Sequence, residues 1–416
     1  ATAIPCQVDA YANLPGTIWF DSALAEVGGV SLLCVHPLFL VRGKLPDVQD
    51  LECALAEGKA KFPLGGMAGF FDYEGNYQFY WYEIIYRWDT ARCVWLRGEP
   101  LVGYNGKSQL FSESCVNSDR MIQDCSLEGG YSLRLRPIVG REKFLQSVGA
   151  IKDYIAAGDI YQACLTYDWA GVFEGNSWEL YKRMRQLSPA PYGAYMNFEG
   201  FQVLSASPEM FLKIAGDSIW TRPIKGTRKR GLKPDAELAR ELLTSEKERA
   251  ELTMITDLER NDLGKVCRYG TVRVEELFRV ERYSHVLHLV STVSGRLRDS
   301  CTHPQALAAC FPGGSITGAP KIRAMEILEE LEGRPRGIYT GAIGYFGFDG
   351  ISVFNIAIRT FVVKEGFASY GTGAGIVADS VPEQEWEETL AKARVVELLG
   401  CGESCLALRK KERGNF

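Results

Sequence analysis

The basic segment TRPIKGTRKRG at residues 221–231 places one lysine, Lys225, between a proline–isoleucine pair and a glycine. Like charges disfavour the ammonium form, so a lysine among cationic neighbours can serve as an uncharged, nucleophilic amine. A basic loop that binds phosphate would carry a similar charge pattern. The residues alone therefore leave two interpretations of Lys225 open, a nucleophile and a phosphate contact.

Two pairs of glutamates, Glu248 with Glu251 and Glu385 with Glu388, each have a spacing of three residues. Residues three apart on a helix lie on the same face. Two such faces brought together would supply oxygen ligands for a Mg²⁺ ion that keeps several waters. The spacing alone favours the alternative, two solvated acidic faces in which Glu388 forms an ordinary ion pair with Lys392.

Two glycine-rich stretches could bind an anion through backbone N–H groups. Residues 311–328, FPGGSITGAPKIRAMEIL, predict a turn that leads into a helix, where the free N–H groups and the dipole favour negative charge. This turn is not a Walker A loop, because Gly318 is followed by alanine and proline. In residues 370–380, YGTGAGIVADS, alternate glycines would allow a ligand to approach the backbone. A tight turn explains the first stretch equally well, and a bend in a strand explains the second better.

His285 and His288 resemble a metal-binding pair only until their context is considered. They lie in SHVLHLVSTV, a strand pattern in which residues three apart point to opposite faces. The chain has four histidines and no C-x-x-C motif, so we do not expect a zinc site. Either histidine could still donate or accept a hydrogen bond in another kind of site.

The composition is that of a globular protein and excludes several classes. Of 416 residues, 46% are hydrophobic, and 47 basic against 52 acidic residues give a net charge of -5. General polyanion binding is therefore not expected. The 12 cysteines are dispersed, which is typical of reduced thiols in the cytoplasm. We recognise no signal peptide in the first residues and no apolar run long enough to span a bilayer, so we expect a cytoplasmic protein.

The spacing of apolar residues, together with residues that start or stop helices, predicts the helices and strands that could position these residues. We expect helices at 141–159, at 235–264 with a break near Thr244 and Ser245, and from Pro382 to Gly400. Strand-like runs are interleaved with them. The order is mixed rather than strictly alternating, which predicts an α+β fold. The polar segment 111–130 is the best candidate for a linker.

Nine segments of the chain, together and in order, resemble the chorismate-utilising enzymes. This family comprises aminodeoxychorismate synthase component I, anthranilate synthase component I, and the isochorismate and salicylate synthases. The segments are SASPE (205–209), PIKGT (223–227), EKERAELTMITDLERNDLG (246–264), HLVSTVSG (288–295), FPGGSITGAPKIRAMEIL (311–328), GAIGYFGFDG (341–350), IAIRT (356–360), GAGIVADS (373–380) and EWEETLAKA (385–393).

The resemblance implies a four-layer α/β/β/α arrangement in which two sheets pack face to face. It covers residues 137–402 strongly, and GGMAGFFDYE at 65–74 is similar to the family's N-terminal region. We therefore divide the chain into an N-terminal region at 1–135, a chorismate-binding catalytic region at 136–402 and a C-terminal tail at 403–416.

Two positions sort the members of the family. Isochorismate and salicylate synthases carry a water-activating lysine where this chain has Gln162, and anthranilate synthases usually carry alanine where it has Lys225. The pair is similar to the aminodeoxychorismate synthases, which aminate chorismate at C4. Anthranilate synthase component I is the alternative, and a phosphate- or nucleotide-binding module is a distant one. The chain departs from the family's usual QVNLSQR with QACLTYD at 162–168.

The resemblance also implies roles for the site residues. Lys225 would attack C2 of chorismate, and Glu209 would act as general acid and base. Mg²⁺ would be bound by Glu251 and Glu388 directly, and by Glu248 and Glu385 through waters.

The remaining implied roles concern substrate binding and partners. The enolpyruvyl carboxylate would be bound by Tyr339 and Arg359, and the ring carboxylate by Lys392 and the backbone of Gly373, Ala374 and Gly375. Thr317 and His288 would contact the ring. No segment resembles the nucleophile motif of a glutaminase, so we expect ammonia from a separate glutamine amidotransferase subunit.

Overall fold

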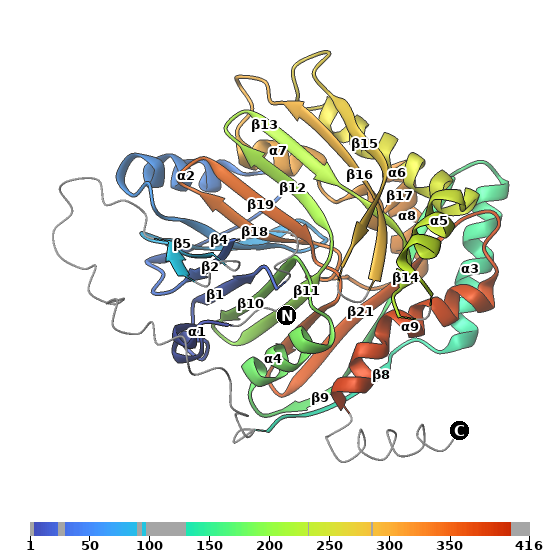
Figure 1. Ribbon diagram of the computed structural model, residues 1–416, viewed down its shortest axis with the longest axis horizontal. Helices are drawn as coiled ribbons and strands as arrows, with labels where there is room; N and C mark the ends of the chain where they lie inside the picture. Colours follow the sequence, from blue (N-terminus) through green and yellow to red (C-terminus); the bar gives the residue numbers. More distant parts are fainter. Residues whose placement is uncertain are drawn as a thin grey trace.

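The computed structural model describes residues 4–23, 30–89, 94–96, 130–231, 233–283 and 286–400. These residues form two large antiparallel sheets surrounded by helices (Figure 1). The proposed linker at 111–130 lies, except for its last residue, outside the described residues, as do His285 and the C-terminal tail.

The first sheet, sheet A, has eleven strands among the described residues. Their order is β17-β9-β21-β20-β11-β10-β1-β2-β6-β7, and β8 pairs with β9. The strands are β1 (Thr17–Asp21), β2 (Val30–Cys34), β6 (Tyr86–Asp89), β7 (Val94–Leu96), β8 (Ser132–Pro137), β9 (Gln162–Glu174), β10 (Tyr192–Phe198), β11 (Phe201–Ser207), β17 (Gly318–Ala319), β20 (Thr360–Lys364) and β21 (Phe367–Ile376).

The second sheet, sheet B, has ten strands in the same part of the chain. Their order is β14-β16-β13-β12-β19-β18-β4-β5-β3, and β15 pairs with β16. The strands are β3 (Phe39–Lys44), β4 (Gly66–Phe71), β5 (Asn76–Tyr82), β12 (Met210–Ala215), β13 (Ser218–Arg222), β14 (Ile224–Lys229), β15 (Arg273–Arg282), β16 (Val286–Arg296), β18 (Ala342–Gly347) and β19 (Ile351–Ile356).

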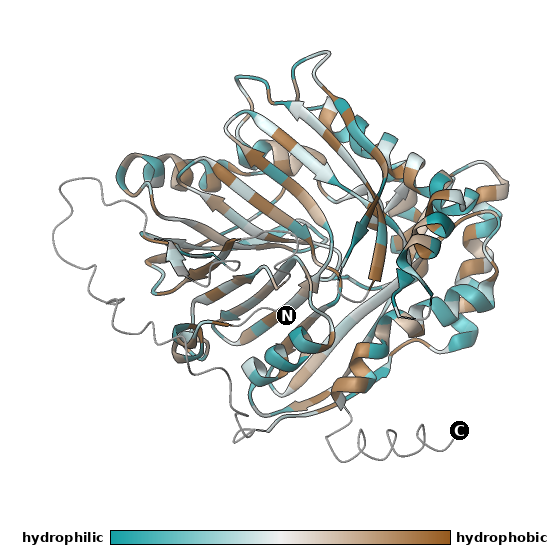
Figure 2. Ribbon diagram, viewed as in Figure 1, coloured by the Kyte–Doolittle hydropathy of each residue, from teal (hydrophilic) through white to brown (hydrophobic). Residues whose placement is uncertain are grey.

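Helices cover the outer faces of both sheets. Those that share a core with sheet A are α1 (Cys6–Tyr11), α3 (Arg141–Ala156), α4 (Ser177–Leu187), α8 (Lys321–Glu332) and α9 (Pro382–Gly400). Those that share a core with sheet B are α2 (Gln49–Lys61), α6 (Glu246–Gly264) and α7 (His303–Cys310), while α5 (Asp235–Thr244) packs on β16. The helices carry teal polar and brown apolar residues along their length, as expected for amphipathic helices (Figure 2).

A third core lies between the two sheets and completes four layers. It contains Ile18 and Met196 from sheet A and Phe70, Tyr82 and Ile343 from sheet B, all buried. The α+β fold and the α/β/β/α layering are therefore confirmed. The inter-sheet core draws mainly on β1, β2, β4, β5, β10, β11 and β18. Where β9 and β21 approach β14 and β16, polar residues take the place of this apolar core.

The three expected helices are confirmed, including the break in the second. Ser245 separates α5 from α6 and caps α6, because its hydroxyl accepts the Glu248 N–H. Gly158 follows α3 with a φ of 86°, which suits glycine at the end of a helix. The final helix begins at Pro382 and ends at Gly400, as the sequence predicts.

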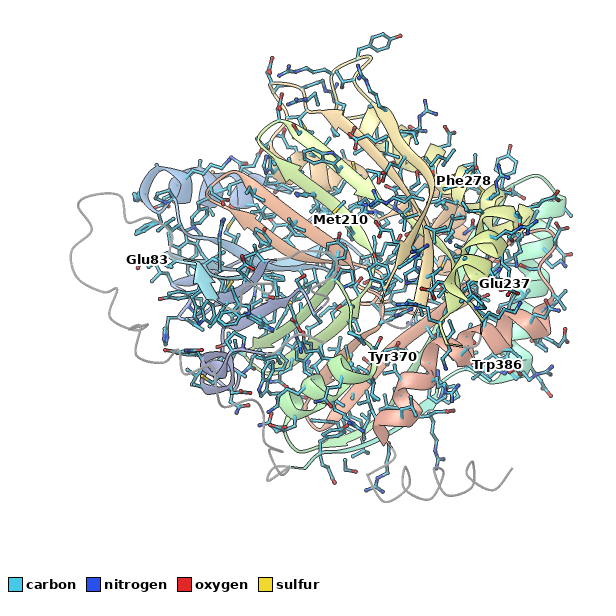
Figure 3. All side chains as sticks on the ribbon, in the orientation of Figure 1. Glu83, Met210, Glu237, Phe278, Tyr370 and Trp386 are labelled. Carbon is cyan, nitrogen blue, oxygen red and sulfur yellow. The ribbon has the colours of Figure 1, made fainter. Side chains whose placement is uncertain are left out.

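The chain passes from one sheet to the other at two adjacent points that matter for the site. Between β11 and β12 it passes through Glu209, and between β19 and β20 it passes through Arg359; Met210, labelled in Figure 3, begins β12. The Ile356 N–H donates to the Glu209 carbonyl (3.1 Å), and the Ala206 N–H donates to the Arg359 carbonyl (3.0 Å). These bonds hold the two connections together, so Glu209 and Arg359 enter the same inter-sheet region.

The N-terminal region contributes strands to both sheets. Strands β1, β2, β6 and β7 extend sheet A, and β3, β4 and β5 extend sheet B. The boundary expected at residues 135 and 136 falls within β8. No helix in the described residues is long and apolar enough to cross a membrane.

Candidate active site

Three alternate glycines on β21 open one face of sheet A. Gly371, Gly373 and Gly375 lie on the same face because strand side chains alternate. A Cβ on Gly371 would come within 2.1 Å of the Tyr339 ring. A Cβ on Gly375 would lie 3.0 Å from Nε2 of Gln162 and 3.9 Å from Nζ of Lys225. The missing side chains therefore let residues from both sheets meet against β21.

The backbone N–H groups of these glycines are directed away from β9. Gly375 is paired with Cys164, whose N–H donates to the Thr317 carbonyl (2.7 Å), on the side away from β21. Gly373 is paired with Thr166, whose N–H donates to a Glu332 carboxylate oxygen (2.8 Å). In such antiparallel pairs both residues direct their N–H groups outward. The Gly373 and Gly375 N–H groups therefore point to the side of β21 that faces β20.

That side of β21 has room for an anion. Strand β20 pairs with β21 only as far as Tyr370, so no described strand continues along residues 371–376 there. Lys392 of α9 lies on this side, because its Nζ donates to the Gly373 carbonyl (2.9 Å). Backbone N–H groups beside a lysine could bind a carboxylate, and those of Gly373 and Gly375 are directed to this side. The Ala374 N–H instead faces β9, because Ala374 forms the hydrogen-bonded pair with Leu165.

Lys225 reaches this face from sheet B. It lies on β14 opposite Leu289, next to a bulge at Gly226, whose φ is 75°. Its charge acts on the carboxyl groups of Glu209 and Glu251, so it lies close to both. The side-chain amine of Lys225 forms no ion pair or hydrogen bond with another described residue.

The arginines of the basic segment are paired with carboxylates, whereas Lys229, exposed at the end of β14, forms no ion pair with another described residue. Arg222 contacts Glu281, and Arg228 binds both carboxylate oxygens of Glu248 (2.6 and 3.1 Å). Lys233 pairs with Glu237 (3.0 Å) and Glu241. This pairing leaves Lys225 available for a ligand, and it does not support a phosphate-binding loop.

Glu209 is suited to proton transfer. It is 6% exposed, and burial raises the pKa of its carboxyl group, although Ser315 and Lys225 act in the opposite direction. A carboxyl group with a raised pKa keeps its proton to a higher pH, which favours a role as general acid. Sequence reasoning did not identify Ser315, which lies in the glycine-rich turn.

Three of the four predicted metal-binding glutamates come together between α6 and α9. Lys247 lies 3.9 Å from both Glu251 and Glu385. Burial raises the pKa of Glu251, and the charges of Glu388 and Glu385 add to this effect. Lys225 and Lys247 act to lower the same pKa but do not outweigh burial. Burial acts to raise the pKa of Glu388. The charge of Lys392, whose Nζ lies 2.7 Å away, acts in the opposite direction, and the pKa is lowered overall.

This carboxylate group fits Mg²⁺ as a partial site. No described set of three His, Cys, Asp or Glu side chains is arranged to hold a metal by itself. Mg²⁺ commonly takes only one or two protein carboxylates and fills its other positions with water and substrate oxygens. Glu251 and Glu388 could supply those two. Glu385 accepts a hydrogen bond from Ser380 (2.7 Å), and Glu248 is instead engaged by Arg228.

The other predicted substrate contacts differ in how directly they can act. Burial, and then Arg359, lower the pKa of His288 to about 4, so its imidazole is neutral at pH 7. Arg359 has a φ of 52°, an uncommon conformation that is often found at functional sites. Burial raises the pKa of Tyr339 well above its usual value, so its phenol stays protonated. The Thr317 hydroxyl donates to the Gly313 carbonyl (3.0 Å), which gives this residue a supporting part.

The glycine-rich turn is not a free anion site. Its Gly314 N–H donates to Glu259 (3.0 Å), and Lys321 contacts Asp262. Protein carboxylates therefore already occupy the groups that a phosphate would need. The turn instead supports β9 through Thr317.

Gln162 has the least satisfied side chain at this site. It is 1% exposed, and both its amide nitrogen and its amide oxygen lack a hydrogen-bond partner among the described residues. Buried polar groups are nearly always hydrogen-bonded, so an exception needs an explanation. A ligand between the sheets would supply the missing partners.

Gln162 also marks a site wall that the sequence pattern could have revealed more fully. In QACLTYDW, residues Ala163, Leu165, Tyr167 and Trp169 belong to the core beneath the helices. The alternate residues, Gln162, Cys164, Thr166 and Asp168, therefore lie on the opposite face, with the glycines of β21. The polar–apolar alternation was a signal for all four positions.

Comparison with known proteins decides the family. Residues 53–397 match the family of chorismate binding enzymes. The chain belongs to this family. Two similar relatives are aminodeoxychorismate synthase component 1 of Bacillus subtilis (strain 168), 49% identical over 252 residues, and anthranilate synthase component 1 of Aquifex aeolicus (strain VF5), 48% identical over 258 residues. The matches cover 60% and 62% of this chain but only 54% and 52% of those relatives, about half their length.

Solved structures agree with the fold of this chorismate-binding protein. Anthranilate synthase component I from Streptococcus pneumoniae TIGR4 superposes with a TM-score of 0.74 at 30% identity, covering 88% of this chain and 92% of that one. The menaquinone-specific isochorismate synthase MenF of Escherichia coli gives a TM-score of 0.73 at 16% identity, covering 93% and 89%. Relatives with different activities match almost equally, so individual site residues must distinguish among them.

Proposed function

We propose that this chain is an aminodeoxychorismate synthase component I, which converts chorismate and ammonia to 4-amino-4-deoxychorismate for the synthesis of p-aminobenzoate and folate. The observation that carries the proposal is the position of Lys225. It reaches from sheet B to within 3.9 Å of a Cβ position on Gly375 and has no carboxylate partner among the described residues. A lysine placed in this way can act as a nucleophile.

In the proposed reaction, the Lys225 nitrogen forms a bond to C2 of chorismate. The two ring double bonds shift, and the C4 oxygen leaves as water after it accepts a proton from Glu209. Ammonia then forms a bond to C4, the double bonds shift back, and the C2–nitrogen bond breaks. Glu209 accepts a proton from the amine, so the enzyme returns to its starting state.

The remaining residues would bind and orient the substrate. Tyr339 and Arg359 would bind the enolpyruvyl carboxylate, and Lys392 with the backbone N–H groups of Gly373 and Gly375 would bind the ring carboxylate. Bound at Glu251 and Glu388, Mg²⁺ would neutralise negative charge on the ring carboxylate. The buried amide of Gln162 would hydrogen-bond the incoming nitrogen in place of a water-activating base.

The nitrogen would come from a separate glutamine amidotransferase subunit. In the absence of that partner, a high concentration of ammonium salt should replace it. We place the reaction in the cytoplasm, where chorismate and reduced thiols are both expected.

Product identification tests the proposal. The protein is incubated with chorismate, Mg²⁺ and ammonium salt, and the products are separated and identified by mass spectrometry. We expect 4-amino-4-deoxychorismate. Fluorescent anthranilate as the product would instead assign the chain to anthranilate synthase component I, the second candidate. ATP binding without turnover of chorismate would support a nucleotide-binding module.

A further inference from the structure

Cys164 has a thiol on the same wall of the site as the unpartnered amide of Gln162. Strand β9 is bordered in sheet A by β21 and β17, and its apolar face is covered by helices α3, α8 and α9. Cys164 belongs to the opposite face, yet it is partly exposed and forms no disulfide. This face of β9, which also carries Gln162, is directed toward sheet B and Lys225.

The register places this thiol beside the reacting groups. Cys164 is directly opposite Gly375, and this is the pair type in which the two residues approach most closely. A Cβ at Gly375 would lie 3.0 Å from the Gln162 amide and 3.9 Å from the Lys225 nitrogen. The amide of Gln162, 1% exposed and without a partner, independently indicates that a ligand occupies this space.

One cation interacts with the thiol. The Arg336 guanidinium, which is paired with Glu332, donates to the Cys164 carbonyl (2.7 Å) and interacts electrostatically with the thiol. Partly exposed cysteines with cationic neighbours are those that react most readily with electrophiles. Of the other described cysteines, Cys34, Cys267 and Cys310 are buried, and Cys6 and Cys53 are exposed on helices. Cys301 is also partly exposed and has Arg298 nearby, but it lies in a separate groove.

We propose that Cys164 is a covalent modification site for small thiol-directed electrophiles within the substrate pocket, and that its modification and chorismate binding exclude each other. With iodoacetamide, the Cys164 sulfur forms a bond to the reagent's methylene carbon, iodide leaves, and the thiol proton passes to the buffer. No oxidant or reductant is involved. The inference rests on the proposed function only in so far as chorismate is the ligand of this site.

The test is the rate at which iodoacetamide alkylates each cysteine of the folded, full-length protein. The reaction is run with and without chorismate and Mg²⁺, and each cysteine is followed by peptide mass spectrometry after digestion. At a chorismate concentration ten times its dissociation constant, alkylation of Cys164 should slow about 11-fold by mass action. Cys53 and the partly exposed Cys301, which lines a separate groove of about 380 Å³ between α2 and α7, should react at unchanged rates.

Matched variants separate the possible outcomes. In Cys301→Ser the protection of Cys164 should persist, and in Cys164→Ser alkylation should no longer reduce whatever chorismate affinity the variant has. Calorimetry on the same samples reports chorismate binding directly. Binding without protection of Cys164, or failure of Cys164 to react while Cys53 is consumed, would overturn this inference alone. Absence of chorismate binding to the unmodified protein would overturn both this inference and the proposed function.

Discussion

At the scale of single residues, the site combines groups that are unfavourable in the free protein. The Gln162 amide is buried without partners, and Glu209 is a buried carboxyl group with a raised pKa. Each costs free energy that a ligand between the sheets would recover. Such costs are expected where a site is preorganised for a bound molecule.

Replacing Gln162 by leucine tests this trade-off. The buried amide has no partner, so Gln162→Leu should raise the free energy of unfolding by roughly 1–3 kcal/mol in urea titrations. Amination activity should fall by at least about tenfold, because the nitrogen loses its hydrogen bond. Gln186→Leu on the exposed face of α4 is the control and should leave both quantities nearly unchanged. Lower stability of Gln162→Leu would show that the amide already has partners.

At the scale of elements, β21 has glycine at three alternate positions on one face, and residues from both sheets meet there. Three glycines on one face leave room for the Tyr339 ring, the Gln162 amide and the Lys225 amine. Alternation on the neighbouring β9 puts a polar residue opposite each glycine. A single methyl group on this face should therefore interfere with the ligand more than with the fold.

Gly375→Ala is the sharpest test of that statement. Its new methyl group would lie 3.0 Å from the Gln162 amide, a side-chain end that can shift. We expect chorismate affinity, measured by calorimetry, to fall on the order of tenfold while the unfolding transition stays cooperative. Gly149→Ala on α3, where no atom lies within 4 Å, should instead stabilise the protein by about 0.5–1 kcal/mol. Unchanged chorismate affinity in Gly375→Ala would remove β21 from the site.

Helices α6 and α9 should act together on Mg²⁺. Glu251→Gln removes one ligand charge, so the Mg²⁺ concentration needed for half-maximal activity should rise on the order of 10- to 100-fold. Asp257→Asn, an exposed position on the same helix, is the matched control. An unchanged Mg²⁺ requirement in Glu251→Gln would contradict the metal assignment.

Glu259 on α6 should make stability depend on pH. Burial, and next Asp262, raise its pKa from 4.5 to about 7. Between these values the folded state holds a proton that the unfolded state has lost, so stability falls as pH rises through this window. Glu259→Gln keeps an acceptor for the Gly314 N–H and should remove a fall of about 3 kcal/mol between pH 4.5 and 7. Urea titrations across this range should show a flatter profile than in Glu326→Gln on α8; equal slopes would contradict the prediction.

At the scale of the whole molecule, the sequence predicts the helices and the α+β class, and it names site residues whose roles stay predictions. Helix limits follow from local signals, such as Ser245 between two helical patterns and Pro382 before the last. The sequence does not predict that Gln162, Cys164 and Gly375 lie on the same face of sheet A. This depends on the register between strands that are more than 200 residues apart in the chain.

The sequence also does not predict which cations of the basic segment form ion pairs, for the same reason. The basic segment reads as a uniform cluster, yet its arginines bind carboxylates from α5, α6 and β15, whereas Lys225 in the site has none. Glu248, expected near the metal, is engaged by Arg228 because β14 passes beside α6. Long-range contacts thus decide which member of a local cluster is available for chemistry.

The most direct test of the account is to trap the bond between Lys225 and chorismate. The protein is incubated with chorismate and Mg²⁺ without ammonia, denatured rapidly, and measured by intact mass and peptide mapping. The account predicts an adduct on Lys225 that disappears in Lys225→Ala and persists in Lys229→Ala on the same strand. An adduct of unchanged yield in Lys225→Ala would contradict it.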